Sequence, residues 1–218
     1  MFENQGLRTA FGGVDDFFLE MAKSAPNEVD VYNEDDPLSR YASLAPTTFD
    51  IPNETNKPYA HFDAMYAGSP SQYPEIRAGL TFGRTSRHPY WQSLLNGSRF
   101  PTILGVSGVG KTTLARQVAL SLVDEGFMGW EHHPNRPIFS DKWRALAGDL
   151  RERGKKGVLV LDDAHSYLPE VNNLVDLLVA DGHGSLRLIL TSANNHWKPC
   201  VKERLNYRLG FADFWAGV

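Results

Sequence analysis

The sequence has little cysteine and no long apolar run, and both absences limit what it can be. Cys200 is the single cysteine among 218 residues, so no disulfide can form within the chain. No apolar stretch approaches the roughly 18 residues of a membrane-spanning helix, and the N-terminus lacks the charged-then-apolar pattern of a secretory signal. We therefore expect a cytoplasmic chain without a membrane partner.

The sequence also lacks an excess of positive charge. Its 22 Lys and Arg residues are outnumbered by 26 Asp and Glu residues, which gives a formal net charge of −4. Proteins that bind nucleic acid or anionic membranes usually present a basic surface. The charge balance therefore does not indicate nucleic acid as the main partner, although it leaves a role on DNA open.

One glycine-rich stretch, residues 100 to 120, reads FPTILGVSGVGKTTLARQVAL and matches the pattern G-x-x-x-x-G-K-[ST]. Backbone N–H groups can wrap a polyphosphate only where no Cβ blocks the approach, and the next helix points its positive end at the phosphates. Lys111 would reach the β- and γ-phosphates, which also makes it a candidate catalytic residue, and Thr112 would be a ligand of the bridging Mg²⁺. The expected nucleotide-binding residues are Gly105, Gly108, Val109, Gly110, Lys111, Thr112 and Thr113.

The flanks of this stretch have the character that such a loop needs. Residues 102 to 104 form a short apolar run after Pro101, as in a buried strand. Apolar residues then recur at helical spacing at positions 114, 115, 118, 119 and 122, and Gly126 would end the helix. A glycine-rich surface turn without function would not need both flanks, so the sequence favours a nucleotide-binding loop.

The second motif is VLVLDD at residues 158 to 163. Four apolar residues followed by carboxylates are typical of a buried strand whose acids emerge at the carboxyl edge of a parallel sheet. Asp162 is the candidate to hold Mg²⁺ through its water shell, and Asp163 the candidate to orient or deprotonate the attacking water. The alternative is that both acids only cap the next segment. His165 lies at the same edge, where it would touch the γ-phosphate or a neighbouring subunit, or have no catalytic duty.

A further buried strand is expected at residues 186 to 190, and polar residues follow it. A polar side chain at the tip of the strand next to the phosphate-loop strand can hydrogen-bond the γ-phosphate or the attacking water. The candidate catalytic residues at this tip are Thr191, Ser192 and Asn194.

Between residues 102 and 191 the pattern alternates strand and helix, which predicts an α/β fold with a doubly wound parallel sheet of the P-loop NTPase type. Helices are expected at residues 86–96, from Ser140 as the cap to Gly154, and from Pro169 to Gly182. A strand is expected at residues 127–132, and the tandem His132-His133 at its end is better explained by hydrogen bonds than by a metal.

Residues 1–78 differ in character and are expected to form an acidic, Pro-rich N-terminal arm, ahead of a P-loop NTPase domain at residues 79–218. Asp15 or Asp16 would cap one short helix in the arm. Prolines at 26, 37, 46, 52, 58, 70 and 74 interrupt every other candidate element. Scattered aromatic residues argue against full disorder, so the arm would lie over its own domain or bind a partner.

About residues 80 to 212 resemble the nucleotide-binding domain of the STAND class of signal-transduction P-loop ATPases, which are relatives of AAA+ proteins. The resemblance rests on FGR at 82–84, the loop at 105–113, LVLDDAH at 159–165 and LTS at 190–192. It implies that Phe82 and Arg84 lie near the adenine and ribose. The chain departs from the family at ANN, residues 193–195, where an arginine is common. No helical lid or winged-helix segment is recognisable after the core, so we expect either a fragment or a reduced family member.

The resemblance implies an ATP-binding, slowly hydrolysing switch with Mg²⁺, whose nucleotide state controls self-association or an attached effector; defence against phage is a typical setting. The alternative is an AAA+-type motor or loader acting on DNA, which predicts a basic, aromatic channel that the sequence does not show. A nucleotide kinase is disfavoured because no arginine-rich lid follows the core, and a GTPase because no [NT]-K-x-D motif follows the last strand. A basic tail residue such as Arg208 is a candidate arginine finger, with surface charge as the alternative.

Overall fold

The computed structural model describes residues 37–58, 68–83, 87–97, 99–182 and 184–197, all within one compact unit that starts at residue 36. The short helix expected after Asp15 or Asp16 and the tail from residue 198 onward, with its candidate arginine finger, lie outside the described residues.

Five strands form one sheet in the order β1-β3-β4-β5-β2. β3, β4, β5 and β2 run parallel, whereas β1 pairs antiparallel with β3. Because Leu161 pairs with Leu190 and Leu104 with Ser192, the carboxyl ends of β4, β5 and β2 lie side by side. The strand bounds are Thr48–Asp50 (β1), Thr102–Gly105 (β2), Met128–His132 (β3), Gly157–Leu161 (β4) and Leu186–Ala193 (β5).

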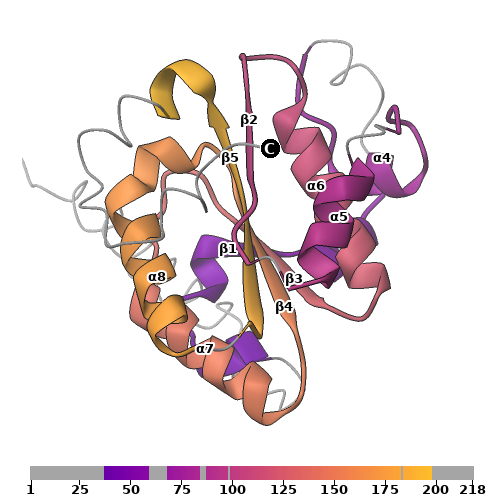
Figure 1. Ribbon diagram of the computed structural model, residues 1–218. Helices are drawn as coiled ribbons and strands as arrows, with labels where there is room; N and C mark the ends of the chain where they lie inside the picture. The colour runs from indigo at the N-terminus through magenta and orange to yellow at the C-terminus, as the bar shows by residue number, and fades with distance from the viewer. Residues whose placement is uncertain (1–36, 59–67, 84–86, 98, 183, 198–218) are drawn as a thin grey trace, which may run out of the picture. The chain divides into compact units, whose positions relative to one another are not determined.

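Helices cover both faces of the sheet, which confirms the doubly wound architecture. Figure 1 shows α7 and α8 on one side of the sheet and α4, α5 and α6 on the other. Short 3-10 helices lie at Pro37–Arg40 (η1), Ala45–Thr47 (η2) and Ala164–Tyr167 (η3). The α-helix bounds are Ile51–Thr55 (α2), Tyr73–Arg77 (α4), Arg87–Leu95 (α5), Lys111–Asp124 (α6), Ser140–Glu152 (α7) and Leu168–Ala180 (α8).

Strand β4 shows why the sheet is buried on both faces. Its side chains alternate, so that Leu159 and Leu161 belong to the core under α7 and α8, while Val158 and Val160 belong to the core under α6. All four are 0–1% exposed. A strand without a polar face can only sit between two helical layers, as the sequence predicted.

The segment expected to be an irregular arm contributes regular structure from residue 37 onward. β1 extends the sheet, and α2 and α4 pack on α6 within the same compact unit, so the contacts do not divide at residue 78. Prolines were expected to interrupt elements here, but Pro52 and Pro74 lie in the first turns of α2 and α4, where a missing N–H costs nothing.

Two boundaries differ from the sequence prediction. Ser140 is not the cap of α7 but its first residue; its hydroxyl instead donates to the Glu170 carbonyl of α8 at 3.2 Å. β5 continues to Ala193, so Thr191 and Ser192 lie inside the strand rather than after it. The strand is longer because β2 pairs with it as far as Gly105.

None of the helices in the described ranges is long and apolar enough to cross a membrane.

Candidate nucleotide-binding site

The loop between β2 and α6 favours glycine at two positions for its backbone and at a third for space. Gly108 and Gly110 have φ angles of 79° and 81°, in the left-handed region that side chains disfavour. At Gly105 a Cβ would lie 3.0 Å from Val109 Cγ2, so the valine side chain would have to shift slightly. The loop therefore has the tight backbone that the spacing of glycines predicted.

The first turn of α6 starts at this loop. Gly110 caps the helix without a side-chain hydrogen bond, and no acidic residue lies in the first turn. Free N–H groups at a helix N-terminus, together with the helix dipole, favour an anion. Lys111 begins the helix, and its Nζ donates to the Val106 carbonyl at 3.0 Å, so the lysine lies against the loop.

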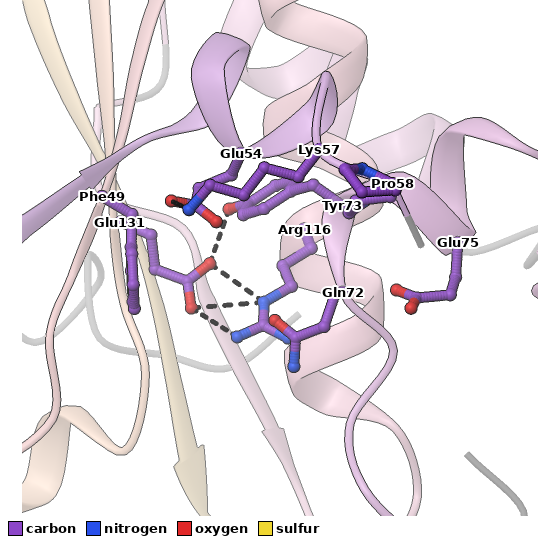
Figure 2. Close-up of a pocket in the computed structure, with 10 residues that line it drawn as sticks. Phe49, Glu54, Lys57, Pro58, Gln72, Tyr73, Glu75, Arg116 and Glu131 are labelled. Carbon is purple, nitrogen blue, oxygen red and sulfur yellow. Dashed lines mark hydrogen bonds and ion pairs between the residues drawn. The ribbon is translucent and has the colours of Figure 1, made fainter. Parts of the chain in front are cut away.

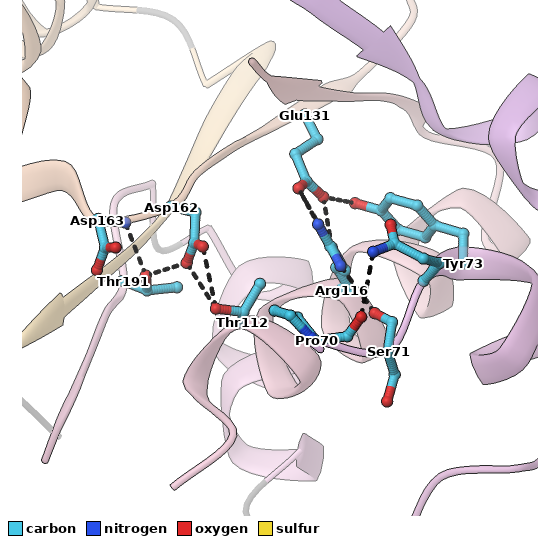
Figure 3. Close-up of polar contacts among 10 residues, drawn as sticks. Pro70, Ser71, Tyr73, Thr112, Arg116, Glu131, Asp162, Asp163 and Thr191 are labelled. Carbon is cyan, nitrogen blue, oxygen red and sulfur yellow. Dashed lines mark hydrogen bonds and ion pairs between the residues drawn. The ribbon is translucent and has the colours of Figure 1, made fainter. Parts of the chain in front are cut away.

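Two hydroxyl side chains meet on one carboxylate at the carboxyl edge of the sheet. The Thr112 hydroxyl lies 2.9 Å from Asp162 Oδ1 and 3.0 Å from Oδ2, and the Thr191 hydroxyl donates to Oδ1 at 2.5 Å (Figure 3). The structure thus brings together α6, β4 and β5, as expected from a parallel sheet. Thr191 comes from β5, which is the neighbour of β2.

Asp163 follows with an uncommon backbone. Its φ and ψ of 47° and 45° are left-handed, and its N–H donates to Thr191 Oγ1 at 3.1 Å. Outside glycine this conformation is uncommon, although aspartate tolerates it better than most residues. The turn separates the two aspartates: Asp162 is half-buried between threonines, and Asp163 is exposed.

These groups line one cavity of about 410 Å³. Oxygen donors from a carboxylate and a hydroxyl suit Mg²⁺, and a glycine cradle beside a lysine suits phosphates, so the residues present fit a magnesium-bound nucleoside triphosphate. The cavity is lined by residues 68–71, by Ser107, Gly108 and Gly110 of the loop, by residues 111–113, and by Asp162 and Asp163.

The remaining polar residue of the β5 tip, Ser192, faces a different partner. Its hydroxyl lies 3.1 Å from His165 Nδ1, and His165 Nε2 lies 3.0 Å from His196 Nδ1. Burial lowers the pKa of His165, and the nearby His196 and Lys111 add to this effect. The sequence suggested that His165 lies at the site edge, and the structure places it beside Ser192.

Two other candidates lie apart from these contacts. Asn194 is exposed, in the helical turn after β5. Phe82 is 95% exposed, and its carbonyl accepts a hydrogen bond from Gln117 Nε2 of α6 at 3.0 Å. Arg84 lies outside the described residues.

A buried polar cluster beside the cavity was missed by the sequence analysis. Arg116 of α6 binds Glu131 of β3 through Nε and Nη2, the shortest distance being 2.6 Å, and the Tyr73 hydroxyl donates to Glu131 Oε2 at 2.6 Å (Figure 2). Burial alone would lower the pKa of Arg116, but the bond to Glu131 and its charge raise it. Burial and Glu131 both raise the pKa of Tyr73 well above its ordinary value.

One sequence signal could have revealed this cluster. Arg116 is a charge within the expected helix, and Glu131 is a charge within the expected strand, between Trp130 and His132. A charge inside an otherwise buried element needs a partner, so two such charges of opposite sign indicate a pair.

The tandem histidines at the end of β3 have partners within the protein. His132 Nε2 donates to the Arg136 carbonyl at 2.9 Å, and the His133 ring lies 3.6 Å from the Phe49 ring. Within the described ranges, no group of three or more His, Cys, Asp or Glu side chains is arranged to hold a metal ion.

Three solved structures resemble this chain at low sequence identity and with TM-scores below 0.5. The ORC2 protein of Aeropyrum pernix, in ADPNP-ADP complexes, is 19% identical with a TM-score of 0.41, over 55% of this chain and 42% of its own. Hsp104 of S. cerevisiae, in complex with casein, is 17% identical with a TM-score of 0.45, over 73% and 28%. PCH-2 of C. elegans is 14% identical with a TM-score of 0.40, over 72% and 45%. This chain thus spans less than half the length of each.

No curated protein matches the sequence. The family described as Novel STAND NTPase 5, in contrast, matches residues 65–204, which is more than half of the chain. The match takes in the glycine-rich loop, both aspartates and the tip of β5. The chain therefore belongs to the Novel STAND NTPase 5 family, and its resemblance to the STAND class is confirmed.

Proposed function

We propose that this NTPase domain binds ATP with Mg²⁺ and hydrolyses it slowly, and that the bound nucleotide acts as a switch controlling self-association or an attached effector. The observation that supports the proposal best is the convergence of Thr112 and Thr191 on Asp162 beside the glycine-rich loop. A carboxylate held by two hydroxyls next to an anion cradle suits a Mg²⁺ that bridges phosphates.

Each side chain then has a role in binding. N–H groups of the loop and of the first turn of α6 would bind phosphate oxygens, and Lys111 would exchange its bond to Val106 for one to the β- and γ-phosphates. Thr112 and Asp162 would hold Mg²⁺, which supplies charge neutralisation when bound. The exposed Phe82 ring is available to the base, and Arg84 would assist by family analogy.

Other side chains would serve hydrolysis. Asp163 would orient the attacking water or accept its proton, because it is exposed at the cavity while Asp162 is engaged. Thr191 would keep Asp162 in place and Ser192 would respond through His165. Asn194 is the weakest candidate, since it lies exposed beyond the strand.

Nucleotide binding is tested by calorimetry with Mg·ATP on the full chain. We expect Lys111→Ala to abolish binding, because the lysine is the only cation lining the cavity among the described residues. Lys142→Ala, which removes an exposed lysine on α7, is the matched control and should bind as the unmodified chain does. Unchanged affinity in Lys111→Ala would refute the phosphate-loop role.

The switch is tested by comparing association with ATP, with ADP and with added DNA. Light scattering should show larger particles with ATP than with ADP, and DNA should not raise the rate of hydrolysis. Stimulation by DNA without ATP-dependent association would instead favour the motor alternative.

A further inference from the structure

Besides binding Glu131, the buried Arg116 contacts the chain segment that lines the nucleotide cavity. Arg116 is 8% exposed and Glu131 3%. Nε and Nη2 of Arg116 are used by the carboxylate, while Nη1 donates to the Ser71 carbonyl at 2.8 Å (Figure 3). Ser71 ends the stretch of residues 68–71 that lines the same cavity as Lys111, Thr112 and Asp162. One guanidinium therefore ties this segment to the core.

The helical spacing explains why the two sites are linked. Thr112 and Arg116 lie four residues apart on α6, so both side chains lie on the same face of the helix. Thr112 contacts Asp162 at the end of β4, and Arg116 contacts Glu131 in β3, the neighbouring strand. The same face of α6 thus contacts Asp162 through Thr112 and holds the 68–71 segment through Arg116.

The segment has further supports close to the tether. Gln72 Nε2 donates to the Pro70 carbonyl at 3.1 Å, which closes a local turn, and Pro70 restricts the backbone there. Tyr73, the first residue of α4, binds Glu131 through its hydroxyl, and its ring lies 5.6 Å from the Arg116 guanidinium. The 68–71 segment is therefore held at its C-terminal end by side chains of α6, β3 and α4.

We propose that residues 68–71, which precede the phosphate loop in the sequence, form a second wall of the nucleotide site. We further propose that Arg116 is the positioning residue that holds this wall in place. The inference rests on the proposed ATP binding. The wall offers the hydroxyls of Ser69 and Ser71 and carries no charge of its own, so it adds hydrogen-bonding capacity beside the phosphates without electrostatic repulsion.

The energetics of buried ion pairs support a positioning role. Removing two charges from water costs about as much as their attraction returns, so a buried pair contributes little to stability compared with apolar residues of the same volume. What arginine adds is a planar fork with five donors, which can serve a carboxylate and a carbonyl at once. Arg116 uses the fork in this way, with separate nitrogens for Glu131 and for Ser71.

The test is an Arg116→Lys variant of the full chain. Lysine retains the charge that Glu131 needs, but its three N–H donors share one nitrogen, so they cannot match the separate positions from which the planar fork of Arg116 reaches Glu131 and the Ser71 carbonyl. We expect the Kd for Mg·ATP and the KM to rise about fivefold or more, because one hydrogen bond to a charged group is lost. The kcat at saturating ATP should change less than about twofold. Arg144→Lys, the same change in the bidentate pair with Asp181 on the other face of the sheet, is the matched control.

A second measurement follows the backbone of the wall itself. Hydrogen exchange of the unmodified chain should show that residues 68–72 become protected when Mg·ATP binds, and Arg116→Lys should lose most of this protection. Wild-type affinity in Arg116→Lys, or equal weakening in Arg144→Lys, would overturn the inference, as would an unchanged exchange rate in residues 68–72. If the unmodified chain itself fails to bind Mg·ATP, the proposed function fails first, and the two failures are thereby distinguished.

Discussion

The Thr112 hydroxyl lies 2.9 Å from Asp162 Oδ1, although 50 positions separate the two residues in the sequence. The contact crosses the sheet, because β4 and β2 are not neighbours and β5 lies between them. The start of α6 reaches over β5 to the end of β4. The hydroxyl and the carboxylate are thus held together, which under the proposed function would lower the cost of ordering them when Mg²⁺ binds.

We expect Asp162→Asn to reduce ATP hydrolysis by about 100-fold or more, because the amide cannot supply the charge that holds Mg²⁺. The amide oxygen still accepts from Thr112 and Thr191, so the fold should persist. Hydrolysis at saturating ATP, titrated with Mg²⁺, measures the effect. A variant with the magnesium dependence of the unmodified chain would contradict the assignment of Asp162 as the metal-side carboxylate.

For Asp163→Asn we expect a different profile, with Mg·ATP affinity retained and turnover reduced by about 100-fold or more, as for loss of a general base. The reason is its position: Asp163 lines the cavity, and it contacts Thr191 through its backbone N–H rather than through its carboxylate. Calorimetry and steady-state hydrolysis separate the two effects. Asp176→Asn, an exposed aspartate on α8, serves as control. Full turnover in Asp163→Asn would remove its proposed role.

The sequence predicted the central site because its signals are local. The left-handed backbone of Gly110 and the close approach at Gly105 depend on residues within a few positions of each other in the sequence. Four consecutive apolar residues are enough to identify β4 as a buried strand. Parallel strands with helical crossovers then bring Lys111, Asp162 and Thr191 to one edge, without any need to know side-chain contacts.

The Arg116 cluster could not be predicted in the same way, because its contacts depend on how three elements pack. Glu131 lies 15 positions from Arg116 and 58 from Tyr73, and Ser71 lies 45 positions from Arg116. No periodic pattern links these positions. The sequence shows only two charges in buried elements, and the packing of α6 on β3 decides that they meet.

Strand β1 was missed for a related reason. It has only three residues, Thr48–Asp50, which is too short for an alternating pattern to be recognised. The backbone pairing with β3 defines it, for example between Phe49 and Glu131. Its neighbouring prolines suggested an irregular chain, because proline at the start of a helix and proline that breaks a helix look alike without the flanking caps.

His132 should make stability depend on pH. Burial lowers its pKa, since the side chain is 4% exposed and its Nδ1 is buried without a hydrogen-bond partner among the described residues. The bond from Nε2 to the Arg136 carbonyl raises the pKa and offsets only part of this effect. The unfolded chain therefore binds a proton more readily than the folded one. The stabilising contribution of neutral His132 is complete above the unfolded-state pKa of about 6.5 and is lost as the pH falls from there through the folded-state pKa.

Urea denaturation at pH 8 and at pH 5.5 measures this contribution. We expect the free energy of unfolding to fall between the two conditions, and to fall less in His132→Gln, whose amide can still donate to the Arg136 carbonyl but does not titrate. Because both chains contain the other histidines, their contribution to the pH dependence cancels in the comparison. An equal loss in both chains would show that His132 does not carry the effect.

The core beside β4 should tolerate no added methyl group at Gly157. A Cβ there would lie 2.8 Å from both Leu150 Cδ1 and Trp130 Cζ3, so Gly157→Ala must displace packed side chains and should lower the free energy of unfolding by about 1–3 kcal/mol. Gly148→Ala in α7 is the matched control: nothing lies within 4 Å of the new Cβ, and alanine in a helix interior should raise stability by about 0.5–1 kcal/mol. Urea denaturation of both variants measures these changes in the free energy of unfolding. If Gly157→Ala were as stable as the unmodified chain, the packing of α7 against β3 and β4 would be looser than its close contacts indicate.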